Sequence, residues 1–303
     1  MSERARPGLA EVVVAWGFHG VVAAAVFATY TRLGPEALYN VSGSGVEGGA
    51  SRVLVFLGYP TSLVVMAFLP FLAQRLDHPL ASAAALVSFS LCLTIGIPGM
   101  LEPSDLDAKP GNLLAGAGVA IALGLTVLAV MRGGLGDSPP FGRWDWLRAT
   151  VAGLLVVAAV PWIAAELGFF VRGPVFMSEE VVPEAGHPEI RAVHLGHHHG
   201  IDGVLLAWTA LLLTRVTGQL RRPLLRVVVL VWLSLMLVYG LANALEDFWL
   251  EQLVKRGVLD DRLPSMLRPR LSVEWGALLT AAALICLALR RVDTVHRPSR
   301  RSA

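Results

Sequence analysis

Long apolar stretches separated by short polar segments run through the whole chain. Eight of these stretches have the length and polarity of a helix that crosses a ~30 Å hydrocarbon core, which takes about 20 residues. The predicted spans cover residues 12–31, 53–74, 80–101, 113–131, 149–171, 196–216, 225–246 and 272–289. The expected fold is therefore all-α, a polytopic bundle of about eight transmembrane helices. Residues 1–303 are expected to form a single integral-membrane domain.

The distribution of Arg and Lys between the loops predicts the orientation. Segments on the side of the N-terminus carry 15 basic and 6 acidic residues, and segments on the opposite side carry 10 basic and 17 acidic residues. Basic loops stay in the cytoplasm. We therefore expect both termini to be cytoplasmic and the protein to lie in the plasma (inner) membrane. The preference for Arg over Lys, 23 to 2, favours a bacterial source.

Composition agrees with this interpretation and narrows the possible functions. Hydrophobic residues make up 55% of the chain and charged residues only 16%, which is typical of a membrane protein and not of a soluble domain. The net charge of +2 is divided between the two sides, so it gives no indication of nucleic-acid binding. Cys92 and Cys286 both fall in apolar spans and are expected to be core residues, not a disulfide or a metal pair. The first apolar run, 12–31, is expected to be a retained helix and not a cleaved signal.

A cluster of histidines marks the start of the sixth predicted span. Four of the eight histidines fall within six residues, in His194-Leu195-Gly196-His197-His198-His199. The apolar run that follows, 201–214, has only 14 residues before Arg215. To cross the membrane, this helix must include several of the histidines, which would then lie in the outer part of the membrane. Ionisable groups at such depth are costly and mark candidate functional sites.

Helical spacing predicts that some of these histidines share one face of a helix. Pro188 suits the first position of a helix, and a helix from there to residue 216 turns about 100° per residue. His187, His194, His198 and Asp202 then fall within about 80° of each other. His194 and His198, at i and i+4, can reach one ion, with Asp202 as a further ligand. We therefore predict a zinc-like divalent metal ion held by His194, His198 and Asp202.

Small residues lie on the opposite side of the same predicted helix. Gly196, Gly200 and Gly203 cluster there. Small side chains allow the backbones of two membrane helices to approach closely. We expect this side to pack against a neighbouring helix.

Carboxylates on other spans are expected at a similar depth. Glu166 lies six residues before Arg172, about 9 Å below the outer end of the fifth span. Glu246 belongs to a polar stripe with Tyr239 and Asn243 on the seventh span. We predict that Glu166 or Glu246 is catalytic, as the general base for a metal-bound water. The side chains expected to surround the site are His187, His197, His199, Asn243 and Asp247.

Each feature also has a structural interpretation that the sequence leaves open. The histidines could form an adventitious metal site or bind lipid headgroups. Glu166 could pair with Arg172, whereas Glu246 and Asp247 could mark the water boundary. His19, in the middle of the first span, could be a hydrogen-bonded core residue, a member of a proton relay or an axial haem ligand.

The leading functional hypothesis is a metal-dependent membrane enzyme of the hydrolase type whose site opens outward. Its substrate would be a lipid or a lipid-linked molecule from the outer leaflet. The alternative is a transporter or metal-handling protein that uses the same residues as an ion-binding station or proton relay, and a haem protein is the third hypothesis. The lipid bilayer is the expected partner, nucleic acid is not expected, and the sequence leaves the oligomeric state open.

Two short motifs resemble those of known families. His194-x-x-His197-His198 is similar to a histidine box of the membrane fatty-acid desaturases, but their diiron site needs several boxes and this chain has one. His194-Leu195-Gly196 followed by Gly200 resembles the histidine helix of the rhomboid proteases. The only candidate serine motif, Ser42-Gly43-Ser44-Gly45, lies far upstream in a loop. Neither resemblance assigns the chain to a family.

Overall fold

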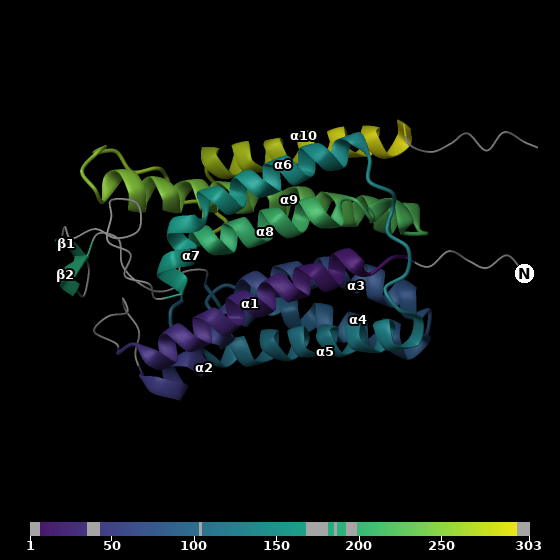
Figure 1. The fold of residues 1–303 in the computed structure, drawn as a ribbon, viewed down its shortest axis with the longest axis horizontal. Coiled ribbons are helices and arrows are strands. Elements are labelled where there is room, and N and C mark those ends of the chain that lie inside the picture. Colours follow the sequence, from purple (N-terminus) through teal and green to yellow (C-terminus); the bar gives the residue numbers. More distant parts are fainter. Residues whose placement is uncertain are drawn as a thin grey trace, which may run out of the picture.

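A computed structural model describes residues 7–34, 43–102, 105–167, 181–184, 187–191 and 199–295. Within these ranges the protein is an elongated bundle of roughly parallel helices, with one small hairpin of strands at one end (Figure 1). Six described helices are long and apolar enough to cross a membrane. The multi-pass membrane architecture expected from the sequence is thus supported, while the total of eight spans and the orientation remain predictions.

Most of the described chain is α-helical, with short π- and 3₁₀-helices next to some of the α-helices. The helices of the first half are α1 (Ala10–Arg32), α2 (Gly45–Phe56), the π-helix η2 (Leu57–Thr61), α3 (Ser62–Leu76), α4 (Pro79–Cys92), the 3₁₀-helix η3 (Leu93–Gly96) and α5 (Pro110–Gly133). The helices of the second half are α6 (Arg143–Ala158), α7 (Val160–Glu166), α8 (His199–Leu213), the 3₁₀-helix η4 (Thr217–Gln219), α9 (Pro223–Trp249), the π-helix η5 (Leu250–Val254) and α10 (Val273–Val295). The strands are β1 (Val181–Glu184) and β2 (His187–Arg191).

The two ends of the bundle differ in charge, and we name them accordingly. At the basic end, α1 begins and α10 ends (right in Figure 1). The charged residues there include Arg75, Arg148, Arg215 and Arg221. The acidic end holds Glu102, Asp105, Glu246 and Asp247. On the charge rule used above, the basic end is the one predicted to face the cytoplasm.

The second predicted span, 53–74, belongs to a longer helix with a local defect. The helix runs from Gly45 to Leu76 and widens into the π-helix η2 at Leu57–Thr61. Pro60 lies inside η2 and cannot donate a backbone hydrogen bond, which accounts for the change in helical register. Tyr59, also within η2, belongs to the candidate site described below.

The fifth predicted span, 149–171, is not one straight helix, which corrects the sequence interpretation. α6 ends at Ala158 and a separate short helix, α7, begins at Val160. Pro161 lies at the start of α7 and lacks the N–H that a continuous helix needs, so the chain breaks there. Leu167 is the last described residue of this segment, and the predicted end at residue 171 lies outside the described residues.

The helix predicted to begin at Pro188 is also wrong. Residues 187–191 form strand β2, which pairs in antiparallel fashion with β1, and the described part of α8 begins at His199. A residue before proline is restricted towards extended conformations, which favours a strand at His187. His187 and Asp202 therefore do not share one continuous helix.

α8 and α9 pack closely against each other at Gly203 and Gly240, and the glycine pattern predicted a close contact on this side of α8. A Cβ added to Gly240 would lie 2.5 Å from the carbonyl oxygen of Gly203, and one added to Gly203 would lie 2.7 Å from the backbone nitrogen of Ala244. Gly200 packs against the indole of Trp162, where an added Cβ would come within 2.5 Å of Cζ2. The expectation of close packing at Gly200 and Gly203 is confirmed.

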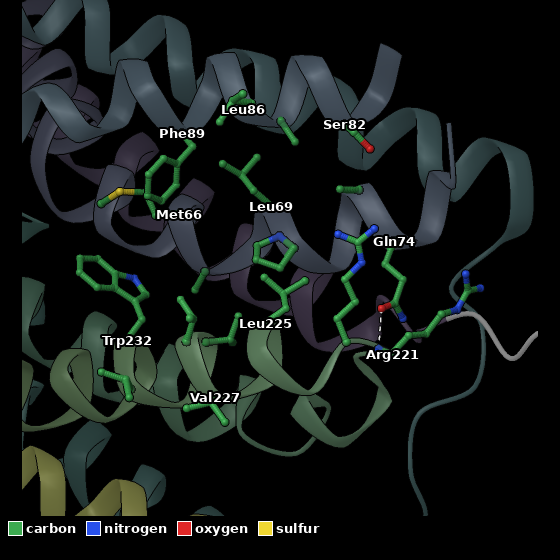
Figure 2. Close-up of a pocket in the computed structure, with 18 of the residues that line it drawn as sticks. Met66, Leu69, Gln74, Ser82, Leu86, Phe89, Arg221, Leu225, Val227 and Trp232 are labelled. Carbon is green, nitrogen blue, oxygen red and sulfur yellow. Dashed lines mark hydrogen bonds between the residues drawn. The ribbon is translucent and has the colours of Figure 1, made fainter. Parts of the chain in front are cut away.

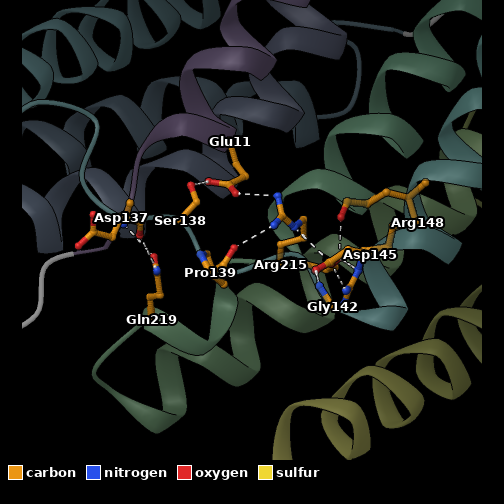
Figure 3. A network of polar contacts seen from close by, with 12 residues as sticks. Glu11, Asp137, Ser138, Pro139, Gly142, Asp145, Arg148, Arg215 and Gln219 are labelled. Atoms are coloured by element: carbon orange, nitrogen blue, oxygen red, sulfur yellow. Dashed lines mark hydrogen bonds and ion pairs between the residues drawn. The ribbon is translucent and has the colours of Figure 1, made fainter. Parts of the chain in front are cut away.

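A polar network fastens the basic end (Figure 3). The Arg215 guanidinium lies 3.2 Å from Glu11 on α1 and 3.2 Å from Asp145 on α6, and Arg148 lies 2.7 Å from Asp145. Ser138 donates a hydrogen bond to Glu11. Burial raises the pKa of Asp145, but the Gly142 N–H and the two guanidinium groups outweigh it, so the pKa is lowered. The network connects α1, α6 and the turn that follows α8.

Candidate functional site

His19 is an ionisable side chain in the middle of a candidate membrane span. It occupies the tenth position of the 23-residue helix α1 and is only 2% exposed. Its Nδ1 lies 3.3 Å from the hydroxyl of Thr61 at the end of η2, and its ring packs against Phe56 with 5.9 Å between centroids. Its Nε2 has no hydrogen-bond partner among the described residues. A buried polar atom of this kind normally binds a water, an ion or a further side chain.

Two tyrosines connect the same level to the other half of the bundle. The hydroxyl of Tyr59 on η2 lies 3.0 Å from that of Tyr239 on α9, and Tyr239 donates a hydrogen bond to the backbone oxygen of Leu267 at 2.8 Å. The Tyr239 ring also packs against Trp275 on α10. A hydrogen-bonded path therefore crosses the interior from η2 to the loop before α10.

Asp202 interacts through its charge with both the histidine and the tyrosine pair. It belongs to the first turn of α8, is 9% exposed, and is close enough to His19, Tyr59 and Tyr239 for its charge to act on all three. Asn243, one helical turn after Tyr239, is 4% exposed, and its Oδ1 has no hydrogen-bond partner among the described residues. We call His19, Tyr59, Thr61, Asp202, Tyr239 and Asn243 the buried polar chain.

The neighbourhood of the buried polar chain is apolar along α1. Ala15 belongs to one hydrophobic cluster and Val22 to another, and His19 lies between them in the sequence of α1. Towards the basic end, the buried face of α1 continues with Ala15 and Val12, both 0% exposed, before it reaches Glu11. His19 and Glu11 are eight residues apart, or about 12 Å of helix. Towards the basic end, α1 thus offers no ionisable side chain for about two turns.

Towards the acidic end, by contrast, the buried polar chain is followed by ionisable side chains. The carboxylate of Asp247 accepts a hydrogen bond from the backbone N–H of Gly200 at 3.0 Å, and so caps the start of α8. One turn beyond, Glu251 is 3% exposed and pairs with Lys255 at 3.1 Å. Polar and ionisable side chains thus lead from the acidic end to the middle of the bundle.

The other predicted acid of α9 has a structural contact. Glu246 accepts a hydrogen bond from the backbone N–H of Met266 at 2.9 Å. This bond holds the chain before α10 next to α9, in the same segment that supplies the Leu267 oxygen for Tyr239. Glu246 therefore helps to shape the loop over the buried polar chain.

Several predicted site residues lie outside the part that the structure describes. His194, His197 and His198 belong to the undescribed residues 192–198. For Glu166 at the end of α7 and His187 in β2, the backbone is described and the side chain is not. His199, the first residue of α8, is half-buried. The predicted metal ligands His194 and His198 thus remain predictions, as does a catalytic role for Glu166.

The structure joins some of the predicted residues to others that the sequence interpretation missed. Of the predicted residues, Asp202 belongs to the first turn of α8 and Asp247 contacts that turn through Gly200. Tyr59, Thr61 and Glu251 were not predicted to contribute. The signal for Tyr59 was present in Gly58-Tyr59-Pro60, a helix-disturbing triplet inside an apolar span. The link from His19 to this group depends on which helices are neighbours, which one sequence does not reveal.

Among the described residues, no group of three or more His, Cys, Asp or Glu side chains is arranged to hold a metal ion. The histidine run itself falls mostly outside those residues. Asp202 and Asp247 nevertheless flank the first turn of α8, directly after the run.

Comparisons with known proteins leave the chain without an assigned relative. No family model, no curated protein and no solved structure matches it.

Proposed function

We propose that this membrane protein binds and moves protons through the buried polar chain, in the manner of a proton-coupled carrier. The observation that carries the proposal is the juxtaposition, inside the bundle, of His19, Asp202 and the Tyr59–Tyr239 pair. Ionisable side chains inside membrane spans are energetically costly and typically mark ion pathways or proton relays. This is the ion-binding and proton-relay alternative from the sequence, extended to residues on four helical segments.

His19 has the chemistry that such a relay needs. Imidazole is the side chain whose unperturbed pKa, about 6.5, lies closest to physiological pH. Its Nδ1 is held near the Thr61 hydroxyl, so Nε2 is the atom with capacity to gain or release a proton. Asp202 supplies the negative charge that stabilises an imidazolium. Asn243 adds a polar oxygen for a water or a hydronium ion.

The asymmetry of the site favours a carrier over an open channel. Charged groups reach from the acidic end as far as Asp247 and Asp202, whereas Val12 and Ala15 close the buried face of α1 towards the basic end. A proton that enters from the acidic end must wait for a rearrangement before it crosses that apolar layer. The close packing of α8 on α9 and the π-helix η2 are the elements that such a rearrangement would involve.

Proton flux into liposomes tests this proposal. The purified protein is reconstituted with a pH-sensitive dye inside, and a potassium diffusion potential, negative inside, is imposed with valinomycin. We expect the wild-type protein to acidify the lumen faster than protein-free liposomes do, and His19→Gln to remove most of that excess. His78→Gln is the matched control, because His78 is an exposed residue at the start of α4. Equal flux from wild type and His19→Gln would contradict the proposal.

A metal site at the mouth of the same chain is the second candidate. Asp202 and Asp247 lie at the first turn of α8, and the histidine run directly precedes that turn in the sequence. On this proposal His194, His198 and Asp202 hold a zinc-like divalent ion, and Glu166 or Glu246 acts on a bound water as in a lipid hydrolase. The alternative role of such a site is metal handling.

Metal analysis separates the second candidate from the first. Purified protein should hold one equivalent of metal, and the His194→Ala, His198→Ala double variant should hold none. Because a ligating imidazole must be neutral, occupancy should fall as pH drops through about 6. Stoichiometric metal in the double variant would place a metal elsewhere. An absorbance spectrum of the same sample tests the third hypothesis, haem on His19.

A further inference from the structure

A groove of about 1080 Å³ lies between α3 and α4 on one side and α9 on the other (Figure 2). This volume is slightly above the ~300–1,000 Å³ that is usual for ligand sites. The groove is separate from the buried polar chain, since none of the six residues of that chain lines it. It extends from Met66 on α3 to Gln74 near the basic end, which is about 12 Å of helix.

The walls of the groove are almost entirely apolar. Leu69 and Met66 form the α3 side, Leu86 and Phe89 the α4 side, and Trp232 the α9 side. Leu86 is 66% exposed and Phe89 is 39% exposed, so the groove opens towards the surface of the bundle. Trp232 donates a hydrogen bond from its indole N–H to the backbone oxygen of Leu63. This bond fixes the ring across the end of the groove that is farther from the basic end. Such walls suit a hydrocarbon chain.

The end of the groove that is nearer to the basic end of the bundle carries positive charge. Arg221 and Arg222 line it at the start of α9, together with Gln74 and Asp77. The Arg221 guanidinium lies 3.3 Å from the Asp77 carboxylate, and the Arg221 backbone N–H donates to Gln74 at 2.7 Å. The side chain of Arg222 is exposed and makes no hydrogen bond or ion pair with any residue in the described ranges. Since one carboxylate faces two guanidinium groups, this end retains a net positive charge.

We propose that the groove is a binding site for one anionic phospholipid from the leaflet at the basic end. The headgroup phosphate lies against Arg222 and Arg221, and an acyl chain follows the apolar walls towards Trp232. Arginine presents a planar set of donors that matches phosphate oxygens. Basic residues at the membrane surface attract anionic lipids. A soluble phosphate compound would leave the apolar walls unfilled, so the site selects a lipid.

The position of the groove gives the lipid a structural consequence. α3 continues from η2, which carries Tyr59, and α9 carries Tyr239. A lipid between α3 and α9 therefore touches both helices that contribute the tyrosine pair. Its binding should stabilise the arrangement in which these helices are seen.

Native mass spectrometry of the detergent-solubilised protein tests the site. The protein is titrated separately with phosphatidylglycerol and with phosphatidylcholine that have the same acyl chains. We expect one phosphatidylglycerol to bind more tightly than phosphatidylcholine. Each arginine at a membrane surface is worth ~1 kcal/mol, or about 5-fold in affinity. Arg222→Gln should therefore reduce the preference about 5-fold, and Arg221→Gln with Arg222→Gln about 25-fold.

Matched variants distinguish a site from general surface attraction. Arg290→Gln removes an exposed arginine from the end of α10 and should leave the preference unchanged. Ala73→Trp fills the groove and should weaken both lipids, whereas Leu154→Trp, a change at an exposed residue of α6, should weaken neither. Thermal unfolding of every variant verifies that it is folded.

Three results would overturn the proposal. One is a preference for phosphatidylglycerol that survives both arginine substitutions. Another is lipid binding that Ala73→Trp leaves intact in a folded protein. The third is full competition by glycerol phosphate, because this would show that the apolar walls contribute nothing.

Discussion

The hydroxyl groups of Tyr59 and Tyr239 lie 3.0 Å apart, and their hydrogen bond has one direction. Tyr239 has a single O–H, which it donates to the backbone oxygen of Leu267 at 2.8 Å. Tyr59 must therefore donate to Tyr239. The oxygen of Tyr59 keeps its capacity to accept, and it lies within range of the charge of Asp202.

This direction predicts unequal effects of removing the two hydroxyl groups. Tyr239→Phe leaves the Tyr59 donor and the Leu267 carbonyl without their partner, and should lower the free energy of unfolding by about 1–3 kcal/mol. Tyr59→Phe removes a donor but leaves the Tyr239–Leu267 bond intact, so its cost should be about 0.5–1.5 kcal/mol. Equilibrium unfolding in detergent measures both values. A larger effect for Tyr59→Phe would show that the direction is reversed.

The contact between α8 and α9 predicts that side chains are not tolerated at its two glycines. Gly203→Leu or Gly240→Leu should destabilise the protein by about 1–3 kcal/mol or more, because each new side chain meets backbone atoms of the other helix. Thermal unfolding in detergent gives the change.

Gly153→Leu is the matched control for these substitutions. Gly153 is a helical glycine of α6 with no atoms within 4 Å of an added Cβ. Its substitution should leave the melting temperature unchanged or slightly higher. Equal melting temperatures for all three variants would mean that α8 and α9 are not packed as described.

The lowered pKa of Asp145 predicts how the stability of the folded protein changes at acidic pH. Its pKa is lowered in the folded protein, so its contribution to stability is fully present above its unfolded pKa of about 3.9 and is lost as pH falls through the folded value. At neutral pH, Asp145→Asn should cost about 1–3 kcal/mol, because Arg148 and Arg215 each lose one carboxylate partner.

The difference in stability between wild type and Asp145→Asn isolates this contribution from the other carboxylates. Measured from pH 7 to pH 3, it should be constant above pH 5 and shrink below about pH 4. A difference that grows as pH falls would mean that the sign of the pKa shift is wrong.

Much of the architecture could be predicted from hydrophobic periodicity, because spans of about 20 apolar residues have few alternatives in a membrane. The failures have local causes. Pro161 divides the fifth predicted span and Pro60 accompanies a π-helix, and both follow from the missing N–H of proline. The strand at residues 187–191 replaced a predicted helix because the spacing of ligand-type residues was given more weight than the conformational restriction before Pro188.

The candidate site was less predictable than the fold. Asp202 and Asn243 could be identified as polar residues in apolar helices, and His19 as an isolated histidine in mid-span. That these side chains lie close together could not be predicted from the sequence, because it depends on which helices are neighbours. Arg215 illustrates the same limit: its position shortened the apolar run, but its pairing with Glu11, 204 residues away, emerges only from the packing.

The most direct test of the central claim is the initial rate of potential-driven proton uptake by liposomes that contain the wild-type protein or Asp202→Asn. Asparagine preserves the size of the side chain and removes its charge, so the two proteins differ in the group that is proposed to stabilise the protonated site. We predict uptake above that of protein-free liposomes for the wild type, and uptake at the protein-free level for folded Asp202→Asn. Equal rates for the two proteins, or wild-type uptake no faster than that of protein-free liposomes, would contradict the account.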